Sequence, residues 1–118
     1  MVTRLTKGRL KVTISETRAE LGEVAAREVG AYIRSLLETK PEVNIIFASA
    51  PSQNDFLANL LLEEIDWSRV NAFHMDEYIG IDPHAPQAFG QFLRDRIFSK
   101  KTFKSVNYID SKAADPAA

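Results

Sequence analysis

Residues 70–80 read VNAFHMDEYIG, in which an apolar-rich run leads directly into two adjacent carboxylates, an aromatic residue and a glycine. A short apolar run bounded by turn residues is typical of a buried strand. In an α/β protein the chemistry usually lies just beyond the end of such a strand. We therefore expect a strand over 70–74 and a candidate site in the loop 75–80.

The rest of the chain alternates between strand and helix patterns. Period-two or short apolar runs predict strands at 10–14, 43–48 and 106–109, and apolar residues at helical spacing predict helices between the strands. This alternation predicts an α/β fold, a three-layer α/β/α sandwich with a mainly parallel sheet. The strands at 10–14, 43–48 and 70–74 are all expected to run parallel in it.

The predicted helices have recognisable starts. Thr17 has capping-box spacing to Glu20, three positions on, and Ser15 is an alternative cap. Gly22 and Gly30 weaken this first helix slightly and would let it pack closely. Ser52 is the expected cap of the second helix, and the third covers 87–98. The apolar stripe of the first helix, expected to face the sheet, consists of Leu21, Val24, Ala25, Val29, Tyr32, Ile33, Leu36 and Leu37.

Composition excludes several classes of function. The chain has 118 residues, 45% apolar and 26% charged, with a net charge of -1 and no cysteine. One soluble domain is expected, without disulfides or thiolate chemistry. The balanced charge argues against a nucleic-acid or membrane-surface partner. No apolar run approaches the ~20 residues of a membrane span, and no signal core follows the N-terminus, so a cytoplasmic location is expected.

Two loops should share one edge of a parallel sheet. The first, Ser49 to Gln53, has small residues and hydroxyls directly before a helix, where backbone N–H groups favour a phosphate or another anion. Pro51 lacks an N–H and removes one donor. From this loop alone, an ordinary capped helix start is the better interpretation.

The second loop carries Asp76 and Glu77. A carboxylate beside bound substrate can act as a general base, whereas the alternative is a solvated acidic turn. The place of the pair at a strand end, beside a possible anion site, favours function. His74 is expected to be structural and His84 solvated, since two histidines without ligand spacing do not make a metal site. Tyr78 could contact a ligand or could equally well contribute packing, and Trp67 is expected to pack in the core.

The stretch Phe73 to Gly80, followed by Pro86 to Leu93, resembles the glucosamine-6-phosphate deaminase (isomerase) family, within the wider group that includes 6-phosphogluconolactonases. Asp-Glu-Tyr followed by Gly is similar to the deaminase branch, because the lactonases usually have Asp-Glu-Arg there. Weaker similarity extends from the first strand to about Ile109. The resemblance implies a Rossmann-like fold and a sugar-phosphate substrate.

The resemblance also implies a reaction, an aldose–ketose isomerisation with loss of the 2-amino group as ammonia. Asp76 matches the acid–base carboxylate that moves a proton between C2 and C1, and Glu77 matches its acidic neighbour. The phosphate-binding loop matches Ser49-Ala50-Pro51-Ser52-Gln53, which makes Ser49, Ala50, Ser52 and Gln53 the expected substrate-binding residues. By the same resemblance the reaction needs no cofactor and no metal.

Two features depart from the family. Its loop usually reads Thr-Gly-Ser-Thr-Pro, so Ala50 and Pro51 alter the expected phosphate geometry. Family members are also much longer, and their second half supplies an Asp and a His for ring opening, a further Glu and basic phosphate ligands. Residues 1–118 are therefore expected to be the N-terminal portion of a sugar-phosphate isomerase/deaminase-like domain, an incomplete sandwich that is inactive alone and forms a homo-oligomer.

Three other functions remain open at this point. The chain could be a non-catalytic sugar-phosphate-binding or sensing module, for which no base is needed and the altered loop is no obstacle. It could be a 6-phosphogluconolactonase-like hydrolase. It could also be a structural remnant that pairs through an exposed sheet edge. Asp76 favours the enzyme over the sensor and the remnant.

Overall fold

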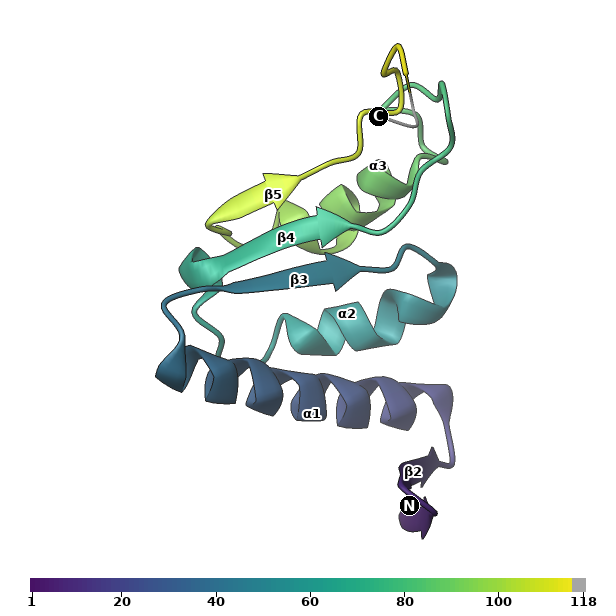
Figure 1. Cartoon of the computed structure of the whole chain (residues 1–118). Helices are drawn as coiled ribbons and strands as arrows, with labels where there is room; N and C mark the ends of the chain where they lie inside the picture. Colours follow the sequence, from purple (N-terminus) through teal and green to yellow (C-terminus); the bar gives the residue numbers. More distant parts are fainter. Residues whose placement is uncertain (116–118) are drawn as a thin grey trace.

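The structure, a computed structural model, describes residues 1–115. Its central sheet has three parallel strands in the order β3-β4-β5, which span Val43–Phe47, Val70–His74 and Ser105–Asn107. β3 and β4 pair in register along their whole length, so they end side by side at Phe47 and His74. The predicted parallel pairing of the strands at 43–48 and 70–74 is confirmed, and so is the mixed α/β fold with a parallel sheet (Figure 1).

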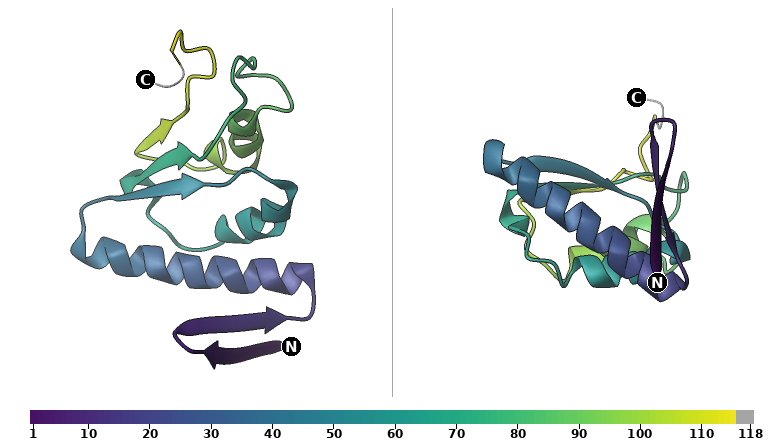
Figure 2. Two further views of the ribbon diagram at one scale, coloured as in Figure 1. Left: turned by 45° about the vertical axis from the view of Figure 1, so that its right-hand side comes forward. Right: turned by 90° about the horizontal axis from the view of Figure 1, so that it is seen from below.

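The prediction that residues 10–14 run parallel within this sheet is wrong. β2, Leu10–Ser15, pairs antiparallel with β1, Val2–Lys7, and the hairpin lies on the far side of the long helix from the sheet (Figures 1 and 2). A period-two pattern indicates a strand but does not name its partner. Gly8, at φ 60°, closes a tight turn that joins β2 to β1 by the shortest loop. β1 itself has no apolar alternation and gives no such signal.

The long helix α1, Arg18–Thr39, begins as the sequence predicts. The backbone N–H of Glu20 donates to Thr17 Oγ1 at 3.1 Å, and the Glu20 carboxylate accepts from the N–H of Glu16 at 2.8 Å. These two bonds satisfy donors that the helix itself leaves unpaired.

The apolar stripe of α1 is only partly buried, because Leu21 is 52% exposed and Tyr32 65% exposed. A helix of this length spans ~33 Å, whereas five-residue strands span ~17 Å, so α1 cannot lie over the sheet along its whole length. It packs instead mainly on α2, Asn54–Leu60.

Two glycines of α1 permit this close packing, as expected. A Cβ at Gly22 would lie 2.6 Å from the Cβ of Asp55, at the start of α2. A Cβ at Gly30 would lie 2.7 Å from the Glu63 carboxylate, just beyond α2. Contacts this short show that both positions exclude a side chain unless something moves.

Helix α3, Phe89–Leu93, continues into a π-helical turn over Arg94–Phe98, so the helix predicted over 87–98 begins two residues later than expected. The second predicted helix corresponds to α2, which ends at Leu60 and is preceded by a 3₁₀ turn over Pro51–Gln53. Trp67 is buried, as expected. The core that joins the helices to one face of the sheet consists of Ala26, Ile33, Leu37, Val43, Phe47, Leu57, Leu60, Trp67, Val70, Ala72, Leu93, Ile97 and Phe98.

In residues 1–115, α1, α2 and α3 lie on this one side of the sheet (Figure 2). The described residues therefore supply two of the three expected layers. The opposite face carries a polar ladder across all three strands: Asn71 donates to Asn44 Oδ1 at 3.0 Å, and the Ser105 hydroxyl donates to Asn71 Oδ1 at 2.7 Å. Nearer the strand ends this face becomes apolar, with Ile46 64% exposed and Phe73 beside it.

Candidate active site at the strand ends

The two candidate loops begin side by side, as predicted. β3 and β4 are neighbours and end level with each other, and the N–H of Met75 donates to the Phe47 carbonyl at 3.1 Å. The loops that follow, Ser49–Gln53 and Met75–Gly80, thus leave the sheet at the same edge (Figure 1). This edge is where open α/β sheets bind ligands.

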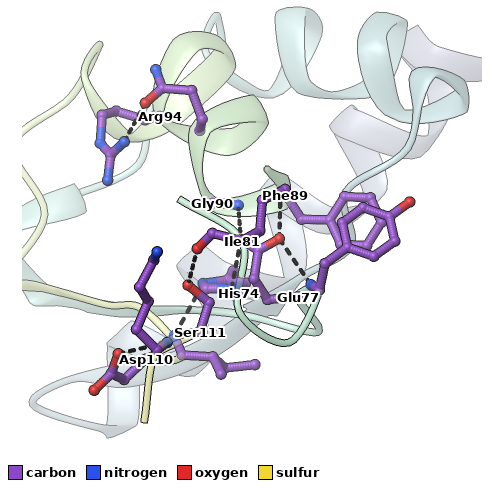
Figure 3. A network of polar contacts seen from close by, with 12 residues as sticks. His74, Glu77, Ile81, Phe89, Gly90, Arg94, Asp110 and Ser111 are labelled. Atoms are coloured by element: carbon purple, nitrogen blue, oxygen red, sulfur yellow. Dashed lines mark hydrogen bonds and ion pairs between the residues drawn. The ribbon is translucent and has the colours of Figure 1, made fainter. Parts of the chain in front are cut away.

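The Glu77 side chain is buried, and both of its carboxylate oxygens accept hydrogen bonds. Its Oε1 accepts from the backbone N–H of Phe89 at 2.9 Å and of Tyr78 at 3.1 Å, and its Oε2 accepts from the N–H of Gly90 at 2.9 Å (Figure 3). Burial raises the pKa of Glu77, but these three N–H groups and His74 outweigh burial and hold the pKa below its usual range. Glu77 is therefore an anionic acceptor at neutral pH.

His74 is buried at the end of β4, with its side chain 1% exposed. Its Nδ1 accepts a long bond, 3.4 Å, from the N–H of Ile109, so the proton of the neutral ring sits on Nε2. Nε2 lies 3.6 Å from Glu77 Oε2 and has no hydrogen-bond partner among the described residues. Burial lowers the pKa of His74, while the carboxylates of Glu77 and Asp76 oppose that shift. The structural role expected for His74 agrees with this placement, and His84 is exposed as expected.

A third segment completes the site, and the sequence analysis missed it. Ser111 is 7% exposed, its hydroxyl donates to the Ile81 carbonyl at 2.7 Å, and its carbonyl accepts from the N–H of Gly80 at 2.6 Å (Figure 3). The small, polar composition of the tail from Ser111 to Ala118 predicts that it is frayed, and this prediction is wrong at Ser111; residues 116–118 lie outside the described residues. One signal was available, because β5 is also parallel and its following loop must reach the same edge.

Asp76 differs from its neighbour in being exposed. Within residues 1–115 its carboxylate has no hydrogen bond or ion pair. It lines a cleft of about 400 Å³ between the acidic loop and the segment after β5, and Glu77, Tyr78, Asp110 and Ser111 also line this cleft. A free carboxylate on such a cleft can accept a proton from a bound molecule.

The predicted phosphate loop has a different local structure from the one expected. Ser52 is exposed and does not cap α2, because Pro51–Gln53 form a 3₁₀ turn whose N-cap, Ala50, has no capping side chain. The N–H of Gln53 is already bonded to the Ala50 carbonyl at 2.8 Å. The hydroxyl of Ser49 is buried and finds no partner among the described residues.

Arg18, at the start of α1, was not singled out by the sequence. Its guanidinium donates to the Pro51 carbonyl at 2.5 Å and pairs with Asp55 at 3.0 Å. It also lines, with Ser52 and Gln53, a hollow of about 360 Å³ between α1 and α2. This hollow is separate from the cleft of Asp76, so the two loops share an edge but open onto different cavities.

Residues 1–115 contain no group of three or more histidine, aspartate or glutamate side chains placed to hold a metal ion. None of their helices has both the length and the apolar character needed to cross a bilayer.

No family model matches the chain. It is 38% identical over 56 residues to a glucosamine-6-phosphate deaminase of an Exiguobacterium species, a match that covers 48% of this chain and 22% of the relative. It is 28% identical over 93 residues to glucosamine-6-phosphate deaminase 2 of Bacillus subtilis, covering 75% and 36% respectively. The chain thus spans less than half the length of these curated relatives.

Solved structures show the same fold. A monomeric glucosamine-6-phosphate deaminase superposes with a TM-score of 0.74 at 21% identity, over 87% of this chain and 44% of that one. A 6-phosphogluconolactonase from Shewanella baltica superposes with a TM-score of 0.73 at 14% identity, over 86% and 43%. In sequence this chain is thus similar to glucosamine-6-phosphate deaminases, and in fold it resembles both a deaminase of that kind and a 6-phosphogluconolactonase.

Proposed function

We propose that this chain belongs to an enzyme that converts an amino-sugar phosphate into a ketose phosphate with release of ammonia, and that Asp76 is its general base. The observation that carries the proposal is the placement of Asp76, an exposed carboxylate without hydrogen bonds or ion pairs to the described residues, at the carboxyl edge of a parallel sheet and on a cleft of about 400 Å³. The substrate class rests on the relatives named as glucosamine-6-phosphate deaminases.

In the proposed reaction the base only has to move one proton between two neighbouring carbon atoms. Asp76 removes the proton from C2 of the open-chain amino sugar while solvent protonates the aldehyde oxygen, which leaves an enolamine. Asp76 then returns its proton to C1, and the nitrogen gives one proton back to solvent. The product is a 2-imine, and water hydrolyses it to the ketose and ammonia. No electrons leave the substrate, so the proposal requires no redox cofactor.

We assign phosphate binding to the loop of Ser49, Ala50, Ser52 and Gln53. The buried Ser49 hydroxyl without a partner supports this assignment, as does the positive charge that Arg18 brings to the loop. The loop offers fewer backbone donors than a glycine-rich loop would, because Pro51 has no N–H and that of Gln53 is bonded.

The proposal extends to the organisation of the protein. Residues 1–118 are taken as the N-terminal portion of the sugar-phosphate isomerase/deaminase-like domain, which works as a homo-oligomer in the cytoplasm. The coverage of less than half of each relative supports the first point, and the apolar part of the bare sheet face supports self-association.

Ammonia release from glucosamine 6-phosphate tests the enzyme. The assay uses the protein as its gene encodes it, with the 118-residue chain alone in parallel. Asp76→Asn should lower turnover by ~10²–10⁴-fold while leaving sugar-phosphate binding in place, since it keeps the shape and removes the base. Glu64→Gln, at an exposed carboxylate elsewhere, is the matched control. Near-normal turnover by Asp76→Asn would reject Asp76 as the base.

The 118-residue chain alone should be inactive. Proton transfer also requires an opened sugar ring and a held phosphate, and the two loops of this chain open onto separate cavities. Turnover by the isolated chain equal to that of the encoded protein would contradict this expectation.

Two other candidates have specific support. The fold match to a 6-phosphogluconolactonase favours a sugar-lactone hydrolase, and the altered loop favours a non-catalytic sugar-phosphate sensor. Hydrolysis of 6-phosphogluconolactone without ammonia release would support the hydrolase. Binding of a sugar phosphate with neither reaction would support the sensor.

A further inference from the structure

Glu77 and Asp76 are adjacent in the sequence but have opposite surroundings. The Glu77 side chain is 4% exposed and makes three bonds to backbone N–H groups, whereas Asp76 is exposed on the cleft. A carboxylate whose oxygens are occupied by fixed donors cannot reach a substrate without breaking those bonds. It is therefore poorly placed to exchange protons with a ligand.

The start of α3 has no capping side chain of its own, and Glu77 supplies the missing hydrogen-bond acceptor. Ala88 is the N-cap of this helix, and its methyl group cannot accept a hydrogen bond. The first N–H groups of a helix have no partner within it, and here those of Phe89 and Gly90 donate to Glu77, which comes from a loop 12 and 13 residues earlier. The carboxylate thus serves as a helix cap supplied from outside the helix.

Gly90 leaves room for this arrangement. A Cβ there would lie 3.1 Å from the Tyr108 ring and 3.5 Å from Glu77 Oε2. The start of α3 therefore lies close to both the segment after β5 and the Glu77 carboxylate, and Figure 3 shows Glu77 directed at Phe89 and Gly90.

The residues on both sides of Asp76 in the sequence are held by hydrogen bonds. Before it, the N–H of Met75 is bonded to β3; after it, Glu77 is bonded to α3. We propose that Glu77 is a positioning residue, whose carboxylate anchors the loop to the start of α3 and so holds Asp76 at the cleft, without itself reacting. The role of Asp76 as a base rests on the proposed function, but the anchoring does not.

The experiment measures order in the ligand-free, ¹⁵N-labelled 118-residue chain, with Glu77→Gln compared with the unaltered chain. An amide in place of the carboxylate loses the charge and puts an N–H₂ donor against a backbone N–H. Amide hydrogen exchange at Phe89 and Gly90 should accelerate by roughly tenfold or more. The backbone order parameter of Asp76 should fall from the rigid range, about 0.85, towards less than about 0.6.

If Glu77 caps α3 but does not hold Asp76 in position, the experiment gives a different result. If exchange accelerates at Phe89 and Gly90 while the order of Asp76 is unchanged, the proposal is overturned, as it is if none of the three positions changes. Glu38→Gln, an exposed carboxylate on α1, is the control and should change none of them. Protection of the Ala72 amide in β4 reports whether the variant is folded. If Glu77→Gln unfolds, Glu77→Asp replaces it in the same measurement. This variant keeps the charge, but its side chain is too short to reach the N–H groups of both Phe89 and Gly90.

The outcome is separable from that of the proposed function, because the order measurement uses no substrate. If the encoded protein releases ammonia, the pH profile adds a second criterion. With Glu77→Gln, kcat should fall while the acidic limb of the profile stays in place, since Asp76 is still the base. Loss of that limb would show that Glu77 is itself the proton acceptor and would overturn the proposal.

Discussion

At the scale of single residues, His74 illustrates how burial sets a protonation state. Its Nδ1 accepts from the N–H of Ile109, so protonation of that nitrogen would place two donors face to face. The charges that face the ring from the packed elements are Glu77 and Asp76 on the acidic loop and Arg94 on the π-helical turn. Burial outweighs the two carboxylates, and the pKa of His74 lies below its usual value.

This shift predicts a pH dependence of stability. Because the pKa of His74 is lower in the folded state, the unfolded chain binds more protons once the pH falls below about 7, and stability decreases as the pH falls towards 5. Glu77 adds a loss in the same direction, but only below about pH 4.5, since its pKa is also lowered.

His74→Asn should flatten the dependence of Tm on pH between about pH 7 and 5. Asparagine keeps an acceptor for the Ile109 N–H and cannot be protonated. Thermal unfolding followed by circular dichroism measures the slope. His84→Asn, at the exposed histidine, should keep the original slope. An equal slope in His74→Asn and the unaltered chain would mean that another group titrates.

At the scale of elements, the contact of α1 with α2 depends on glycine. Gly22 faces backbone: its Cβ would lie 2.8 Å from the carbonyl carbon of Asp55. Gly30 faces the Glu63 side chain, whose carboxylate and Cγ can rotate away, so that only its Cβ, at 3.1 Å, must shift slightly. The two positions are alike in helix propensity but differ in what must move to admit a methyl group.

Gly22→Ala should lower the free energy of unfolding, because overpacking costs about 1–3 kcal/mol and exceeds the gain of about 1 kcal/mol from replacing glycine within a helix. Gly30→Ala should be close to neutral. Urea denaturation of both variants gives the comparison. Equal stability of the two variants would show that α2 can shift away from α1 at little cost.

At the scale of the whole molecule, one face of the sheet is bare in residues 1–115, and its two halves differ. The half near the strand starts is polar and hydrogen-bonded through Asn44, Asn71 and Ser105. The half near the strand ends exposes Ile46 and Met75, 64% and 56% respectively. Grouped apolar side chains of this kind favour association in water.

We therefore expect the 118-residue chain to self-associate, and Ile46→Lys to weaken that association by about tenfold or more, because a buried isoleucine contributes about 1.5–3 kcal/mol. Sedimentation velocity over a range of concentrations measures the association. Leu62→Lys, at a residue 79% exposed elsewhere, should leave it unchanged. A monomer at all concentrations would contradict the expectation.

The sequence alone determined the features that depend on neighbouring residues. The cap of α1 at Thr17 follows from side-chain chemistry within four positions, and the strands at 43–48 and 70–74 follow from short apolar runs. The rule that parallel strands share a carboxyl edge then brings Ser49–Gln53 and Met75–Gly80 together. These predictions hold because local geometry or a general topological rule is enough to make them.

Only the tertiary structure decided which partners distant residues meet. It paired 10–14 with β1 instead of the sheet, bonded the Glu77 carboxylate to the start of α3 while that of Asp76 stays exposed on the cleft, and joined Ser111 to Gly80, 31 positions earlier in the chain. Periodicity specifies which face of a strand or helix is apolar, but not which polar groups the rest of the fold brings within hydrogen-bonding distance. Adjacent carboxylates of similar chemistry thus acquire different surroundings through contacts that are far apart in the sequence.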